Sequence, residues 1–158
     1  MPAAPPRCQM YKRILIATDL SECADAALRA GLRIAQREHA QVHLCTALGT
    51  PTAPMRLGAI VNAERNVGAE TRQAERELTR CATQNGFASI PHELHVFENL
   101  PGDEIPRAAK RLGCDLIVIC ARGRSGSRRF VLGSVAERIL GNSTVPVLVV
   151  PAHVNGRG

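Results

Sequence analysis

The stretch Asp115-Leu-Ile-Val-Ile-Cys-Ala-Arg-Gly-Arg-Ser-Gly-Ser-Arg-Arg-Phe-Val-Leu-Gly-Ser134 carries the pattern that decides the fold. Residues 116–119 form a short, continuous apolar run, which is typical of a buried parallel strand. A basic loop that contains glycine follows, and a helix is predicted to begin at Gly133 and Ser134. The first turn of a helix leaves N–H groups without partners and carries partial positive charge. A strand, a loop and a helix N-terminus in this order therefore predict an anion-binding site.

The loop itself favours phosphate as that anion. Glycine lets a ligand approach the main chain, and arginine presents donors that suit phosphate. The residues concerned are Gly123 and Gly133, with Arg122, Arg124, Arg128 and Arg129. A purely structural interpretation covers part of the same segment, because Ser134 and Glu137 have the spacing of a capping box and surface arginines are often simply solvated. Local chemistry leaves both interpretations open, with nucleotide phosphate as the leading hypothesis.

Strands alternate with helices along the whole chain. Segments rich in apolar residues predict strands at residues 12–18, 42–48, 116–119 and 145–150, and a more mixed segment predicts one at residues 90–97. Helices are expected to open at residues 19–21, after a loop at residues 49–58, at Pro101 with Pro106 in the first turn, and at Gly133. This alternation defines an α/β fold with a parallel sheet. The third strand mixes polar with apolar residues, so we expect it at an edge.

In such a sheet, ligands bind beyond the carboxyl ends of the strands, where the strand order reverses. The end of the first strand, at Thr18 and Asp19, and the end of the fourth, at residues 120–123, are expected to flank that crevice. Asp19 has a structural alternative here as well, as the N-cap of the following helix.

Length and composition bound the remaining classes. A chain of 158 residues predicts one domain, here residues 12–151, between a disordered Pro/Ala-rich tail at residues 1–11 and a polar tail at residues 152–158. Aromatic residues are 3% of the chain, so the core is expected to be aliphatic. The net charge of +6 is diffuse, which disfavours a nucleic-acid partner, and no apolar run is long enough for a membrane span. Six cysteines without a CxxC pair predict a reducing compartment, hence a cytoplasmic protein.

Nothing in the sequence assembles a catalytic group or a metal site. The five histidines are scattered, at positions 39, 43, 92, 95 and 153. His92 and His95 are predicted to point to opposite faces of the third strand. No nucleophile, base and orienting group come together. The sequence therefore predicts a protein that is not an enzyme and that has no metal ligands.

With its other landmarks, the glycine pattern resembles the universal stress protein family. Those proteins carry Gly-x2-Gly-x9-Gly followed by Ser or Thr, and Gly123, nine residues, then Gly133 and Ser134 match the second half. The opening Ile14-Leu-Ile-Ala-Thr-Asp19 and the closing Val145-Pro-Val-Leu-Val-Val-Pro151 are similar to the family too. The resemblance covers about residues 12–151. It implies a single three-layer domain with a five-stranded parallel sheet in the order 3-2-1-4-5 and helices on both faces.

The resemblance also implies a ligand and its site. In the subgroup that binds ATP, alone or with Mg²⁺, Asp19 would contact the base or ribose, with Ala17 and Thr18 beside it and Ala47 near the adenine. The loop from Cys120 and Arg122 would lead to the residues that hold the phosphates, which are Gly123, Gly133, Ser134, Val135 and Ala136. The family further implies a homodimer through strand five, and a regulatory protein partner of unknown identity. Slow hydrolysis of ATP stays open.

One departure from the family pattern leaves two alternatives. The first glycine of the pattern is Cys120 in this chain. Its side chain either points into the core, so that the main chain binds as usual, or crowds the ribose and weakens binding, which we expect. The other subgroup binds no nucleotide, and a member of it would act as a dimeric protein-interaction module.

Overall fold

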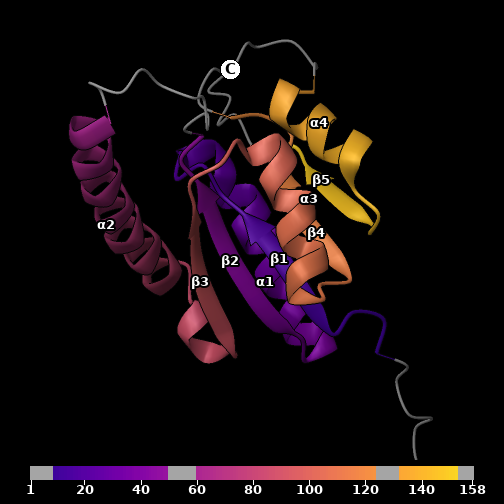
Figure 1. The fold of residues 1–158 in the computed structure, drawn as a ribbon. Coiled ribbons are helices and arrows are strands. Elements are labelled where there is room, and N and C mark those ends of the chain that lie inside the picture. The colour runs from indigo at the N-terminus through magenta and orange to yellow at the C-terminus, as the bar shows by residue number, and fades with distance from the viewer. Residues whose placement is uncertain (1–8, 50–59, 124–131, 153–158) are drawn as a thin grey trace, which may run out of the picture.

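Five parallel strands form one sheet in the order β3-β2-β1-β4-β5, which confirms the predicted topology (Figure 1). The computed structural model describes residues 9–49, 60–123 and 132–152, except for the side chains of residues 60–67. Each neighbouring pair of strands is parallel. The strands are β1 (Arg13–Ala17), β2 (Gln41–Ala47), β3 (His92–Phe97), β4 (Leu116–Cys120) and β5 (Val147–Val150).

Helices cover both faces of this sheet, so the domain has three layers. They are α1 (Asp25–Glu38), α2 (Ile60–Gln84), α3 (Pro101–Leu112) and α4 (Ser134–Asn142), with short 3₁₀ turns η1 (Glu22–Ala24) and η2 (Phe87–Ser89). Figure 1 shows α3 and α4 in front of the sheet and α1 behind it.

Alternation along the strands divides the core between the two faces. Ile14 and Ile16 of β1 belong to the cluster packed against α1 and α2, whereas Leu15 belongs to the cluster packed against α3 and α4. Burial on both faces explains why residues 14–17 of β1 and the whole of β4 are continuous apolar runs. The core is aliphatic, as expected, except that Phe87 is its largest fully buried side chain.

Several predicted boundaries are wrong, and three of them have a clear physical reason. The first α-helix begins at Asp25, because the chain after β1 makes a turn and the 3₁₀ turn η1 before it. Pro106 lies beyond the first turn of α3, whose first position is taken by Pro101, where a missing N–H costs nothing. The last strand begins at Val147, since the backbone N–H of Val145 is bonded to the Ser143 hydroxyl.

Some predictions concern residues that the structure does not describe. These are the tails at residues 1–8 and 153–158, the loop at residues 50–59, and the arginines Arg124, Arg128 and Arg129. Within the described part of the chain, no helix is both long and apolar enough to cross a membrane.

Candidate functional site

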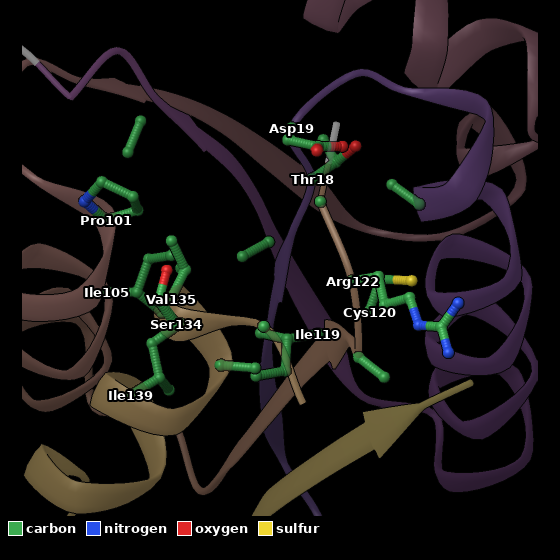
Figure 2. A pocket seen from close by; sticks show the side chains of 17 residues that line it. Thr18, Asp19, Pro101, Ile105, Ile119, Cys120, Arg122, Ser134, Val135 and Ile139 are labelled. Carbon is green, nitrogen blue, oxygen red and sulfur yellow. The ribbon is translucent and has the colours of Figure 1, made fainter. Parts of the chain in front are cut away.

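A pocket of about 320 Å³ lies at the carboxyl ends of β1 and β4, against the start of α4 (Figure 2). Its volume falls at the lower end of the roughly 300–1,000 Å³ that small-molecule sites span. The structure brings all eleven predicted site residues to this one pocket. They are Ala17, Thr18, Asp19, Ala47, Cys120, Arg122, Gly123, Gly133, Ser134, Val135 and Ala136.

Sequence reasoning missed six residues that also line the pocket, and most of them are apolar. They are Ala24, Pro101, Ile105, Ile119, Ala121 and Ile139. The helical spacing of apolar residues in α3 is consistent with a core position for Ile105, but spacing cannot tell which core positions border a cavity. That depends on how α3 and α4 lie across the sheet.

The wall at the end of β1 is fixed by three side-chain hydrogen bonds. The Leu20 N–H donates to Thr18 Oγ1 at 3.0 Å, and the Ser21 N–H donates to Asp19 Oδ1 at 3.0 Å. The Ser21 hydroxyl donates to the same Asp19 oxygen. Leu20 between them has a φ of 63°, in the left-handed region that residues other than glycine rarely adopt. These bonds form an Asx-type turn, so the alternative of Asp19 as a helix N-cap is wrong: the N-cap of α1 is Ala24.

Close packing favours glycine at two positions of the loop. A Cβ atom added to Gly123 would lie 3.1 Å from Oδ2 of Asp19. One added to Gly133 would lie 3.3 Å from the carbonyl oxygen of Ala121, which already accepts a hydrogen bond from the Gly133 N–H at 2.8 Å. The loop after β4 is thereby held against both Asp19 and the start of α4.

The N-terminus of α4 has no side-chain cap. Its N-cap is Gly133, and no side-chain hydrogen bond caps the helix there. Ser134 is the first helical residue, and the Glu137 N–H donates to the Gly133 carbonyl at 3.0 Å. The capping-box alternative for Ser134 is therefore wrong, because that motif needs the serine one position earlier. Among the described residues, the N–H groups of Ser134, Val135 and Ala136 have no hydrogen-bond partner, so they can bind a ligand in the pocket.

The thiol of Cys120 points away from the pocket. Successive side chains of a strand face opposite sides, so Ile119 packs on the side of α3 and α4 and Cys120 on the side of α1. The Cys120 thiol donates to the carbonyl oxygen of Cys23 at 2.9 Å, and burial raises its pKa. The structure thus favours the first alternative for Cys120 and contradicts the expected crowding.

Arg122 also lies differently from expectation. It lines the pocket, but Figure 2 shows its guanidinium directed away from Ser134 and Val135, which lie at the start of α4. In this conformation the pocket presents helix N–H groups, the Ser134 hydroxyl and the Asp19 carboxylate as its polar groups.

Comparison with known proteins identifies the family of this chain. The sequence profile of the universal stress protein family matches residues 10–151. The universal stress protein MJ0531 of Methanocaldococcus jannaschii is 30% identical over 147 residues, which cover 89% of this chain and 82% of that protein.

Solved structures show the same fold. That of MJ0577 superposes with a TM-score of 0.75 at 25% identity and covers 90% of this chain and 96% of its own. A universal stress protein in complex with cAMP superposes at 0.60 with 24% identity, covering 90% and 98%. One from Archaeoglobus fulgidus in complex with dAMP superposes at 0.57 with 22% identity, covering 89% and 98%. With the five-stranded topology, the profile match shows that this chain belongs to the universal stress protein family.

Proposed function

We propose that the pocket binds an adenine nucleotide, with ATP as the ligand, and that the protein acts as a nucleotide-dependent stress-response module. The observation that carries this proposal is the pocket itself, which joins an uncapped helix N-terminus to a carboxylate across a cavity of about 320 Å³. The resemblance of the sequence pattern to the nucleotide-binding subgroup supports the same ligand. So do the complexes of two structural neighbours with cAMP and dAMP.

The two ends of the pocket suit different parts of a nucleotide. The phosphates would accept hydrogen bonds from the N–H groups at the start of α4, at Ser134, Val135 and Ala136, where the helix dipole favours negative charge. Asp19 would accept hydrogen bonds from the ribose or base. Apolar side chains such as Ile105 would cover the remaining surface. Asp19 is the one carboxylate among the described lining residues, so Mg²⁺ would be held mainly by phosphates and water.

A binding role suits these residues better than a catalytic one. The described residues that line the pocket include no histidine and no lysine, and so neither of two common general bases. We therefore propose a regulatory protein that passes its nucleotide state to a protein partner of unknown identity. A cytoplasmic location is supported by the free thiols of Cys23, Cys45, Cys81, Cys114 and Cys120.

The proposal is tested by measuring nucleotide on the protein. Purified protein is denatured, and the released small molecules are separated and identified by mass. Protein stripped of ligand is then titrated with ATP by calorimetry, with GTP as the control. We expect ATP to bind and GTP to bind more weakly. An empty protein that gives no heat with ATP and still dimerises would instead place the chain in the subgroup that binds no nucleotide.

Replacing Cys120 with glycine should leave the ATP dissociation constant unchanged within about threefold, because the thiol points to Cys23 and not into the ligand's space. Since its raised pKa reduces the thiolate fraction, Cys120 should also react with iodoacetamide more slowly than an ordinary exposed thiol. Calorimetry and peptide mass spectrometry measure the two effects. Tenfold tighter binding by Cys120→Gly would show that the thiol crowds the ribose after all.

We propose that a homodimer forms through the open edge of β5. The carbonyls of Pro146 and Val150 accept hydrogen bonds from Ile117 and Ala121, so alternation directs the backbone groups of Val147 and Val149 to the open edge. An apolar strand with an unpaired edge invites pairing with a second chain.

Val149→Pro should shift this dimer toward monomer, because proline removes an N–H at the open edge without removing one from the β4 ladder. Two-fold symmetry applies the loss twice, so we expect the dimer dissociation constant to rise at least about tenfold. Analytical ultracentrifugation measures it, with Val149→Thr as a control that keeps the N–H. A parent that sediments as a monomer at micromolar concentration would refute the dimer.

A further inference from the structure

Two histidines and a glutamate meet on the sheet face covered by α3, outside the pocket. Nδ1 of His43 lies 3.0 Å from Nε2 of His95, and Oε2 of Glu93 lies 3.6 Å from the first nitrogen and 3.8 Å from the second. None of the three lines the nucleotide pocket.

Strand register explains why these residues meet. His43 of β2 is paired with Glu93 of β3, and His95 is two residues further along β3, so all three share one face. The prediction that the histidines are scattered is wrong for His43 and His95, because the sequence alone does not give the register of β2 against β3. It was right that His92 and His95 diverge: His92 packs edge-on against Phe87, on the opposite face.

We propose that His43, Glu93 and His95 form a binding site for Zn²⁺. The three donor atoms lie 3.0, 3.6 and 3.8 Å apart, so the point in their plane that is equidistant from them lies about 2.0 Å from each, close to the Zn–N and Zn–O distances of about 2.0–2.2 Å. Two imidazoles and a carboxylate are ligands that Zn²⁺ accepts, and three protein ligands leave a fourth tetrahedral position for water.

Outer contacts orient Glu93 and His95, as is usual for the ligands of a metal. Gln41 Nε2 donates to Glu93 Oε1 at 2.8 Å, which leaves Oε2 facing the two rings. The His95 ring stacks on Phe97 with centroids 5.9 Å apart and planes within 9°. The guanidinium of Arg111, in α3, lies over the Phe97 ring, 5.6 Å from the ring centroid.

The cluster is open to solvent on one side. The side chain of Glu93 is 54% exposed and that of His95 21%, whereas His43 is buried at 6%. An ion could therefore enter from the Glu93 side and reach His43 at the bottom. Burial lowers the pKa of both histidines, against the opposing effect of Glu93.

The test is a titration of the full chain, stripped with a chelator, with Zn²⁺ by competition against a chromophoric chelator. We expect one ion per chain. His43→Ala or His95→Ala should weaken binding more than about 100-fold, and Gln41→Ala by about tenfold, as for other outer contacts. His92→Ala, on the opposite face of β3, is the matched control and should bind as the parent does. Excess Zn²⁺ should raise the melting temperature of the parent.

The visible spectrum of bound Co²⁺ distinguishes binding at this site from binding at the cysteines. Co²⁺ in the proposed site should show the visible bands of a tetrahedral ion without a thiolate charge-transfer band, and these should vanish in Glu93→Gln. That variant alters an exposed side chain, so it tests the site even where a histidine variant fails to fold. Three results would each overturn the proposal: no Zn²⁺ bound by the parent, equal binding by parent and Glu93→Gln, or a thiolate band. The histidines would then be only a hydrogen-bonded pair beside a glutamate.

Discussion

Replacing Gly133 with valine is expected to abolish detectable ATP binding. A Cβ at this position lies 3.3 Å from the Ala121 carbonyl oxygen and 3.7 Å from the Arg122 Cα, so the valine methyl groups must push the loop aside or enter the pocket. Either movement separates the phosphates from the first N–H groups of α4. Losing two such charge-assisted hydrogen bonds at about 1.5–3 kcal/mol each predicts a dissociation constant at least about 100-fold higher by calorimetry.

Gly141→Val is the matched control for this variant. Gly141 lies in the same helix, and a Cβ added to it meets nothing within 4 Å. Gly141→Val should bind ATP as the parent does, and both variants should keep the circular dichroism spectrum of the parent. Unchanged affinity in Gly133→Val would mean that the nucleotide binds elsewhere. An equal loss of ATP affinity in both variants would mean that valine disrupts α4 itself. The loss in Gly133→Val would then not report on the phosphate site.

Phe87→Ala is expected to cause a large loss of stability with no loss of nucleotide affinity. Phe87 is fully buried in the cluster packed against α1 and α2, and it does not line the pocket. Removing a buried phenyl ring costs about 3–5 kcal/mol in the free energy of unfolding. That is a large share of the roughly 5–15 kcal/mol that stabilises a typical domain. Urea denaturation followed by circular dichroism measures it.

Phe87→Leu fills most of the same space, so it should lose only about 1–2 kcal/mol. ATP titrations at a temperature where each variant is folded should give the dissociation constant of the parent. A loss below about 1 kcal/mol in Phe87→Ala would show that the ring is not a main element of this core.

The strands and their parallel arrangement could be predicted because burial on both faces of a sheet leaves a simple apolar pattern, whereas the strand order 3-2-1-4-5 was implied by the resemblance to the family. Residues 14–17 of β1 and the whole of β4 are apolar runs, and the mixed composition of β3 correctly placed it at an edge. Periodicity could not show the 3₁₀ turn η1, since Thr18 and Asp19 end β1 through their own side-chain hydrogen bonds. It also gave no reason to expect that a phenylalanine, Phe87, would be the largest buried side chain.

The parts of the site at strand ends and helix starts could be predicted from the sequence, whereas the parts that depend on how helices pack could not. Asp19, Gly123 and Gly133 follow strands or precede a helix, so sequence order alone places them at one edge of the sheet. Ile105 and Ile139 reach the pocket because α3 and α4 lie side by side there, which no local pattern encodes. The thiol of Cys120 turned out to face Cys23 because strand alternation, and not the loop that follows, sets its direction.

The left-handed conformation of Leu20 has a consequence for how a ligand would be received. A non-glycine residue in this region costs of order 1–2 kcal/mol, and here the hydrogen bond from its N–H to Thr18 maintains it. This conformational free energy is part of the free energy of folding, so ligand binding does not add it again. The Asp19 carboxylate is thus preorganised, and a nucleotide would bind against it without freezing a mobile turn.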